Sequence, residues 1–475
     1  VHSSNWGTLS RIEGSDLKSF ATSFADSEDG RIFFYLLGGA DAASYKASLT
    51  ISEAQVDPTQ FDGARCGPDG DLDPEDPRCG KLSIVGTVSS CDEDSKQVAL
   101  DALFASHPQM ANWPVGHGFV PMEMKIKEED GLWMIANYGG GGYMQASDYF
   151  DSTPVHHPMK YFSGGNRHLR SLEGSASSCY DMTAHTCECV AEKCGGDLCG
   201  AAGGIWSDQC PGTCDCEQTA AEPVSVPISE DTPAEPVSVP VSGDTPADTT
   251  GNGDGDRSDS GQDVASKKGK GLRPDFGDDS AGHARWLVAK SLWTTISTQS
   301  SKEEGFPFGN IRSVADGACF LGSGGLPYFY VPAPDPTALD IKENNQITLS
   351  FTESVLSQRV GDDGIACGGK DAEDPTCAKI ALFGRAIPIE DDDKIELARA
   401  AFKAQHPRAG WLASGGAHTG GSYYTMQLES ITFIQTYGGF TDLSPEDYLN
   451  WKPDVSMYPG EEQCTSDGGQ EHQHG

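Results

Sequence analysis

The segment CGPDGDLDPEDPRCGKLSIVGTV at residues 66–88 occurs again, in a shorter form, as CGGKDAEDPTCAKIALFGRA at residues 367–386. In each version two cysteines flank an acidic turn that contains Asp-Pro, and an apolar run with partial alternation follows. Such a run, rich in β-branched residues and bounded by turn residues, is typical of a β-strand. The sequence therefore predicts a short acidic loop between two cysteines, leading into a core strand, at two places in the chain.

Other landmarks around this segment also occur twice and in the same order. They are Trp6 and Trp293, the strand-like runs 32–37 and 327–332, the His-Pro pairs at His107 and His406, Trp113 and Trp411, and His117 and His418. An ordered set of shared landmarks is the signature of an internal repeat. We infer two diverged copies of one domain, copy 1 at residues 1–165 and copy 2 at residues 281–455.

The copies are predicted to be mainly β with flanking helices, an α+β class. Runs such as SLTISEA (48–54), FVPMEMKI (119–126) and LWMIANY (132–138) are rich in β-branched and aromatic residues and are bounded by turn residues. The clearest helix runs from Asp391 to Gln405, with a counterpart at 92–106. The histidines that follow these helices, before proline, are interpreted as C-terminal caps.

The net charge of the chain argues against some classes of binding partner. The chain has 71 acidic and 33 basic residues, a formal net charge of -38. This field repels phosphate backbones and anionic lipid surfaces, so nucleic acid is not an expected partner. No apolar run approaches the roughly 20 residues that span a bilayer, so no membrane span is expected.

Cysteine usage indicates an oxidising compartment. Eight of the 15 cysteines fall between Cys179 and Cys216, which predicts a disulfide-rich module at 170–218; a zinc site is the alternative. We expect a secreted or luminal protein. The chain opens at Val1 without an apolar leader, so we expect that a signal peptide has been removed.

Residues 219–280 form a different kind of segment, rich in Pro, Ser, Asp and Gly, with AEPVSVPISEDTP followed by AEPVSVPVSGDTP. This composition cannot bury a core and predicts a disordered acidic linker. A flexible chain of about 60 residues spans roughly 40 Å, which allows the two copies to meet. Residues 456–475 are predicted to be a tail.

The ordered landmarks, most completely His283-Ala-Arg285, Pro307-Phe308, Ser313-Val-Ala-Asp316 and Pro327-Tyr-Phe-Tyr330 of copy 2, resemble the CREG family. This is a family of secreted and endolysosomal proteins on the fold of pyridoxamine 5'-phosphate oxidase. The resemblance implies two FMN-binding-type split β-barrels, joined here by the disulfide-rich module and the linker. In split-barrel relatives two subunits usually pair and hold FMN in the groove between them. Two copies in one chain therefore imply an intramolecular pseudo-dimer.

The groove of copy 2 has two candidate cofactor-binding residues, Arg312 and Ser313, on a strand that could supply donors to a phosphate. Copy 1 has Ala21-Thr-Ser-Phe at the matching place, without a base, and the segment 335–340 of copy 2 is acidic where a phosphate needs cations. An ordinary surface or ion-paired arginine is the preferred interpretation of Arg312, with an anion ligand as the alternative. We expect no cofactor, with FMN as the possible exception.

His117 and His418 are possible groove residues. Imidazole titrates near neutrality and could act as a general base. Neither has an evident nucleophile or carboxylate nearby in sequence, so a structural role is the preferred interpretation, and no catalytic residue is assigned.

Two disulfides are predicted, Cys66 with Cys79 and Cys367 with Cys377. Three cysteines remain as buried thiols, as partners of one another or as links to another chain: Cys91, Cys319 and Cys464. The acidic turn 69–73 is interpreted as solvated, with a calcium site as the alternative. The repeated tryptophans could form a shared face or lie in separate cores.

These observations predict a non-enzymatic binding or structural protein that recognises a protein or a glycan. The alternative is an FMN- or haem-dependent oxidoreductase that uses the groove of copy 2.

Overall fold

The computed structural model describes two stretches of the chain, with short gaps in each. They comprise residues 1, 4–37, 44–56, 66–67, 72–113, 117–136, 140–152, 273–317, 319–333, 335–356, 367, 370–412 and 420–452. The disulfide-rich module, the tail, His418 and most of the predicted linker lie outside the described residues. The predictions for these segments, and for the domain boundaries, stay predictions.

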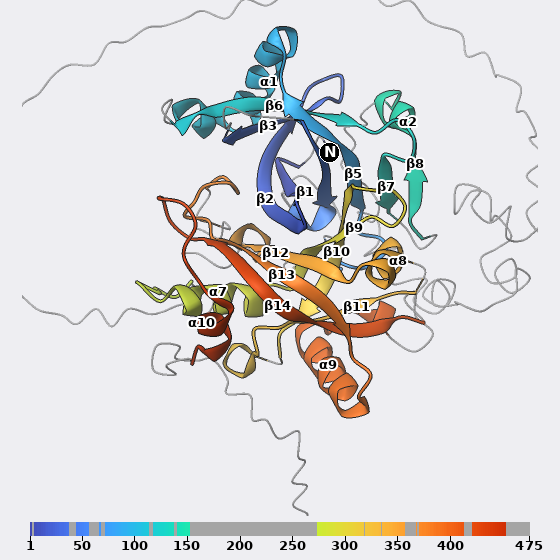
Figure 1. Cartoon of the computed structure of the whole chain (residues 1–475), viewed down its shortest axis with the longest axis vertical. Coiled ribbons are helices and arrows are strands. Elements are labelled where there is room, and N and C mark those ends of the chain that lie inside the picture. Colours follow the sequence, from blue (N-terminus) through green and yellow to red (C-terminus); the bar gives the residue numbers. More distant parts are fainter. Residues whose placement is uncertain are drawn as a thin grey trace, which may run out of the picture. The chain divides into compact units, whose positions relative to one another are not determined.

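Copy 1 forms a closed six-stranded antiparallel barrel (Figure 1). Its strands are β1 (Trp6–Glu13), β2 (Asp16–Asp26), β3 (Ile32–Leu37), β4 (Tyr45–Ser52), β5 (Lys81–Ser90) and β6 (Phe119–Ile126). The order is β4-β1-β2-β3-β6-β5, and β5 pairs back with β4. Two further strands, β7 (Leu132–Ile135) and β8 (Gly142–Met144), extend the sheet from β5.

Copy 2 repeats this topology. Its strands are β9 (Trp293–Gln299), β10 (Pro307–Ala315), β11 (Tyr328–Val331), β12 (Gln346–Thr352), β13 (Lys379–Pro388) and β14 (Ser422–Ile434). They close in the order β10-β11-β14-β13-β12-β9. The predicted mainly β fold with two barrels is therefore confirmed, and so are both disulfides of the cystine loops.

Alternation along the strands builds each barrel core. Phe24, Phe34 and Leu49 are fully buried inside copy 1, and Phe329 and Phe351 are buried inside copy 2. Burying each such side chain is worth about 1.5–3 kcal/mol relative to its exposure. Because side chains alternate between the two faces of a strand, the residues between these positions point out of the barrel.

The two predicted helices begin where the sequence indicates. In copy 1, α1 (Glu93–Ser106) begins at the N-cap Asp92, and a short α2 (Ala146–Phe150) follows β8. In copy 2, α9 (Asp392–Gln405) begins at the N-cap Asp391. Copy 2 also has α7 (Ser280–Lys290), α8 (Pro336–Glu343) and α10 (Pro445–Asn450). Among the described residues, no helix is both long and apolar enough to cross a membrane.

Candidate functional site between the two barrels

The cystine loop of copy 1 is a rigid, internally bonded turn. Its backbone closes through Asp76 N–H to Asp73 O and Cys79 N–H to Asp76 O, each at 2.9 Å. The ammonium of Lys81, buried at the start of β5, donates to the carbonyls of Asp76 at 2.9 Å and Cys79 at 3.2 Å. The disulfide to Cys66 ties the turn to the preceding chain. Together these bonds fix where the loop's carboxylates point.

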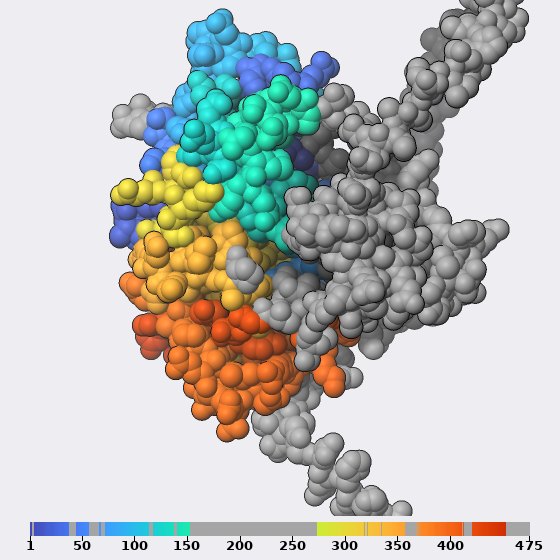
Figure 2. All heavy atoms as spheres, turned by 90° about the vertical axis from the view of Figure 1, so that its right-hand side faces the viewer, coloured from blue at the N-terminus to red at the C-terminus, as the bar shows by residue number. Residues whose placement is uncertain are grey.

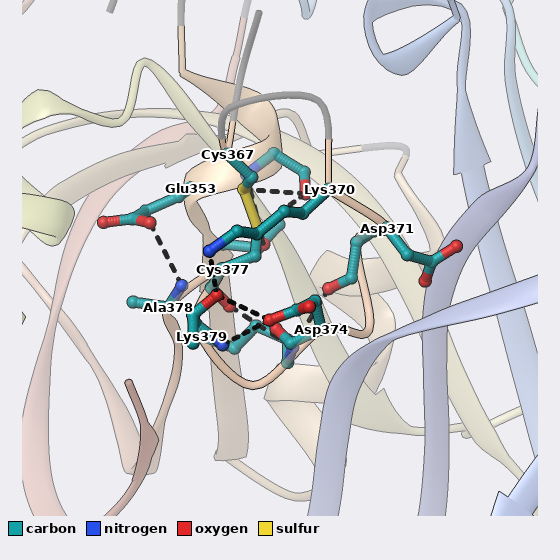
Figure 3. Close-up of a disulfide and its surroundings, with 12 residues drawn as sticks. Glu353, Cys367, Lys370, Asp371, Asp374, Cys377, Ala378 and Lys379 are labelled. Atoms are coloured by element: carbon teal, nitrogen blue, oxygen red, sulfur yellow. Dashed lines mark hydrogen bonds between the residues drawn. A yellow bond between two sulfur atoms is a disulfide. The ribbon is translucent and has the colours of Figure 1, made fainter. Parts of the chain in front are cut away.

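The cystine loop of copy 2 is built in the same way (Figure 3). The disulfide between Cys367 and Cys377 closes it, and the ammonium of Lys379 donates to three loop carbonyls, including that of Cys377 at 3.3 Å. The carboxylate of Glu353 accepts the N–H of Ala378 at 3.1 Å and so anchors the start of β13.

The carboxylates of the copy 1 loop bind copy 2. Asp73 Oδ2 lies 2.6 Å from His406 Nδ1, and Asp73 Oδ1 accepts the hydroxyl of Ser313 at 2.6 Å. Glu75 accepts the N–H of Ser313 at 2.9 Å and lies 3.2 Å from a guanidinium nitrogen of Arg312. All five side chains are buried. The cystine loop of copy 1 therefore binds β10 and the residue that follows α9 in copy 2.

The copy 2 loop makes the equivalent contacts to copy 1. Asp371 Oδ2 lies 2.5 Å from His107 Nδ1 and accepts from the amide of Gln109 at 2.9 Å. The hydroxyl of Ser23 donates to Asp371, and its N–H donates to Glu373 at 3.1 Å. Each barrel thus holds the other with an Asp and a Glu on its own cystine loop. We call these two sets of contacts the acidic clasps.

The clasps differ in the groups that surround their glutamates. In copy 2 the guanidinium of Arg312 bridges Glu75 and Asp335, the N-cap of α8, at 3.2 and 2.5 Å. The equivalent residue on β2 of copy 1 is Thr22, so Glu373 has no guanidinium in this place. The attraction of Lys379 favours the ionised form of Glu373 instead.

Burial sets the protonation of these groups. It raises the pKa of Glu75 to about 7, although the charge of Arg312 acts in the opposite direction. Burial also raises the pKa of Glu373 to about 7, against the charge of Lys379. For Lys81, burial lowers the pKa to about 8, opposed by Glu75. Removing a charge from water disfavours the ionised form, which explains all three directions.

The histidine–aspartate pairs behave differently, because each partner supplies an opposite charge. Burial by itself lowers the pKa of His406, but the hydrogen bond and charge of Asp73 outweigh burial and raise that pKa above its usual value. The pKa of Asp73 is lowered by the same bond, despite burial. The pair of His107 and Asp371 shifts in the same directions for the same reasons.

Between the clasps the barrels meet through hydroxyl groups. The hydroxyls of Thr8 and Thr295 lie 2.8 Å apart, as do those of Ser10 and Ser297. Nearby, the rings of Trp6 and Trp293 are stacked, with centroids 6.4 Å apart. The residues around 300, yellow in Figure 2, lie against the teal surface of copy 1, where the Lys302 ammonium is 2.8 Å from Asp130.

One sequence-based interpretation needs correction. The acidic turn 69–73 is expected from sequence to be solvated, and residues 69–71 lie outside the described residues, but Asp73 is buried and bonded to His406 of copy 2. The predicted C-caps are confirmed, because the backbone N–H groups of His107 and His406 bond to the carbonyls of Leu103 and Phe402. The side chains of the two histidines in addition bind the opposite barrel. Sequence reasoning misses the acids that they bind, although an Asp-x-Glu-Asp-Pro pattern in the first loop and a similar Asp-Ala-Glu-Asp-Pro in the second are a usable signal.

The tryptophans and the remaining cysteines take different positions. Trp6 and Trp293 form a shared face, whereas Trp113 stacks on Tyr35 within copy 1, with centroids 5.9 Å apart. Cys91 is a free, half-buried thiol. Cys319 is disulfide-bonded, so it is not one of the free thiols.

The donors that a flavin phosphate would need do not fit that ligand in this arrangement. Arg312 is already bound by two carboxylates, and Ser313 donates to a third, that of Asp73. A phosphate placed there would meet three acidic side chains and would have to displace the clasp.

The possible groove histidines are not brought to this place together. His117 is exposed, and its ring centroid lies 6.3 Å from that of Phe119, in the aromatic cluster of copy 1. His418 lies outside the described residues.

Comparison with known proteins is consistent with this architecture. The family described as "CREG, beta-barrel" matches residues 1–151 and 275–450. Protein CREG2 of Homo sapiens is 31% identical over 201 residues, which cover 42% of this chain and 62% of that protein. Protein CREG1 of Gallus gallus is 27% identical over 181 residues, 37% of this chain and 88% of that protein. The chain thus spans less than two thirds of the CREG2 relatives that it matches.

Among solved structures, a heme binding protein from Mycobacterium smegmatis is similar with a TM-score of 0.28 and 15% identity. The match covers 38% of this chain and 62% of that one. Campylobacter jejuni ChuZ is similar with a TM-score of 0.27 and 13% identity, over 37% of this chain and 63% of that one.

Proposed function

Because this chain belongs to the CREG β-barrel family, we propose that it is a non-enzymatic binding or structural protein whose two barrels act as one pseudo-dimer. One observation carries the proposal. The basic and hydroxyl donors of the copy 2 groove, Arg312 and Ser313, are already bound to carboxylates of the acidic clasp from copy 1. The groove serves to hold the barrels together, which leaves the outer surface for recognition.

The compartment proposed is the extracellular space or the endolysosomal lumen. Both cystine loops carry disulfides, and a third disulfide includes Cys319. Disulfides persist in oxidising compartments and are rare in the cytosol.

The proposed recognition surface for a protein or glycan partner centres on the turn after β14. Tyr437 and Phe440 are 66% and 65% exposed, unusually high for large aromatic side chains. The ring of Phe440 contacts Phe20 of copy 1, with centroids 5.8 Å apart, and the Tyr437 hydroxyl donates to Asp374 at 3.2 Å. Aromatic side chains that offer both an apolar face and a polar tip are enriched in binding interfaces.

The purified full chain tests the non-enzymatic part of this proposal. We expect no flavin or Soret absorption band, and no quenching of flavin fluorescence when FMN is titrated into the protein. A bound flavin or haem at equal stoichiometry would overturn the proposal and favour an oxidoreductase. If binding is seen, loss of FMN affinity in Arg312→Met would place the flavin in the copy 2 groove.

A second experiment tests the surface. Full-length wild type, Tyr437→Ser/Phe440→Ser and Leu397→Ser are compared on a glycan array and by cross-linking in a secretory-compartment extract. Leu397 is a matched control because it is 59% exposed on α9. A ligand retained by wild type and Leu397→Ser but lost by the double variant supports the proposal. A ligand retained by all three places recognition elsewhere.

A further inference from the structure

The two barrels are related position by position at their interface. Ser23 and Ser313 bind the opposite clasp in the same way, and each lies across the sheet from a tryptophan, Trp6 or Trp293. The strand registers then give the equivalent residues of β2 and β10, and those of β4 and β12. The equivalent residues used below are Ser19 with Gly309, Thr22 with Arg312, and Thr50 with Ser350.

On one side of the interface a serine faces a serine. The Ser350 hydroxyl of copy 2 lies 2.8 Å from the Ser19 hydroxyl and 3.0 Å from its carbonyl oxygen. The neighbouring Thr348 donates to the carbonyl of Leu17 at 2.6 Å. These groups are buried and satisfied, so this side is well packed and fully bonded.

On the other side a threonine faces a glycine. A Cβ atom added to Gly309 would overlap Thr50 Oγ1 and lie 3.2 Å from Thr50 Cβ and 3.4 Å from Thr295 Cγ2. The second γ substituent of a β-branched residue limits how far Thr50 can rotate away. Gly309 therefore makes the space that Thr50 occupies, and no other residue type fits there without a shift.

The charges follow the same asymmetry. Arg312 of copy 2 meets Glu75 of copy 1, whereas copy 1 has Thr22 at the equivalent position. If two copy 1 barrels met in this geometry, Ser19 would strike Thr50 and Glu75 would be buried against Thr22. The pairing of two copy 1 barrels thus combines overpacking with a buried Glu75 carboxylate that keeps Lys81 but lacks Arg312 as a counter-charge.

We propose that Thr50 and Gly309 act as a knob and a hole that select copy 2 as the partner of copy 1 and exclude a second copy 1. Arg312 reinforces the selection through Glu75. Specificity of this kind comes from making the wrong pair worse, not only from improving the right one. The inference rests on the pseudo-dimer of the proposed function and adds the rule for which barrels pair.

The test uses the full chain and the stacked pair of Trp6 and Trp293 as its reporter. The near-ultraviolet circular dichroism of wild type, minus that of Trp6→Phe, measures pairing of the barrels. Gly309→Ser is expected to lose this difference signal, with far-ultraviolet dichroism retained and the unfolding midpoint lowered by about 5 °C. Adding Thr50→Ala removes the overlapping atom and is expected to restore the signal.

Gly309→Ser also makes copy 2 complementary to itself, because the introduced hydroxyl would face Ser350 of a second copy 2 as the hydroxyl of Ser19 does. Sedimentation velocity should therefore show a concentration-dependent dimer for this variant and a monomer for wild type. Gly142→Ser is the matched control, since a Cβ there meets nothing within 4 Å and its φ is not positive.

The outcomes separate this inference from the proposed function. If Trp6→Phe leaves the wild-type near-ultraviolet spectrum unchanged, the barrels are not paired and the pseudo-dimer itself fails. If the reporter works but Gly309→Ser keeps the signal and stays monomeric, pairing stands and the knob-and-hole selection is wrong. Loss of signal without rescue by Thr50→Ala also contradicts it.

Discussion

His406 Nδ1 lies 2.6 Å from Asp73 Oδ2, which joins the end of a helix in copy 2 to the cystine loop of copy 1. The other ring nitrogen lies 2.7 Å from the carbonyl oxygen of Val314. Both side chains are buried, so neither charge can be solvated if its partner is removed. Removing one partner therefore costs more than the intact pair contributes, as is general for buried ion pairs.

Asp73→Asn is expected to lower the free energy of unfolding by about 3–5 kcal/mol, because it leaves His406 without a buried counter-charge. The variant keeps nearly the same shape, so packing changes little. Urea unfolding at pH 6, followed by tryptophan fluorescence, measures the loss.

The control for this prediction is Glu396→Gln, which removes an ion pair to Arg399 on α9 whose side chains are 68% and 59% exposed. That change should cost about 0–1 kcal/mol. A similar cost for both variants would mean that the Asp73 contact is not buried in solution.

Removing the second disulfide, by Cys367→Ser/Cys377→Ser, is expected to cost about 3 kcal/mol on the chain-entropy treatment of a loop of this size. The loop also carries Asp371, so its clasp should loosen. Asp371→Asn is then expected to cost less in the disulfide-free background than in wild type. A double-mutant cycle from urea unfolding measures this coupling. Additive costs would show that the clasp does not depend on the disulfide.

The elements of the fold could be predicted because their signals are local. The N-cap at Asp391, the cysteine pairs and the strand run after Cys377 each lie within a few residues of what they determine. Asp73 and His406 are 333 positions apart, and each has a sufficient local interpretation as an acidic turn or a helix cap. Sequence alone gives no reason to prefer the distant partner.

Arg312 also has a partner that the sequence alone does not identify. The acidic stretch that begins at Asp335 is unfavourable for a phosphate beside Arg312, and this much follows from the sequence. In the structure, Asp335 binds the guanidinium of Arg312 together with Glu75 from the other copy. Asp335 is 23 residues from Arg312 and on the same barrel, whereas Glu75 becomes a partner only through the way in which the barrels meet.

Stability is expected to depend on pH, with a maximum near pH 4, between the usual pKa values of 3.8 for aspartate and 4.5 for glutamate. The pKa of Glu75 is raised to about 7, so its contribution is complete below its usual value of 4.5 and is lost as pH rises through 7. The raised pKa of His406 acts in the same direction. The lowered pKa of Asp73 sets the acid limit, because its contribution is lost below about 3.8.

Urea unfolding at a series of pH values from 3 to 8 measures this profile. Glu75→Gln removes one raised pKa and should flatten the decline between pH 5 and 8. Above pH 8 the lowered pKa of Lys81 begins to act in the opposite direction, so the series ends there. A flat profile in wild type would contradict the burial of these groups.

Arg312→Met is expected to lower the free energy of unfolding by about 3–5 kcal/mol, because the buried Glu75 and the partly buried Asp335 then lack their shared cation. Arg312→Lys should recover only part of this, since an ammonium is a point charge and cannot reach two carboxylates as a planar fork does. Thr22→Val at the equivalent position of copy 1 is the control and should change stability by less than about 1 kcal/mol, because its hydroxyl makes only a 3.3 Å bond to a carbonyl of its own strand. Guanidinium chloride unfolding compares the four proteins. If the loss comes from the carboxylates left without Arg312 and not from lost packing, Glu75→Gln in the Arg312→Met background should restore part of the stability. If Glu75→Gln instead lowers the stability of that background further, Glu75 has another partner in solution.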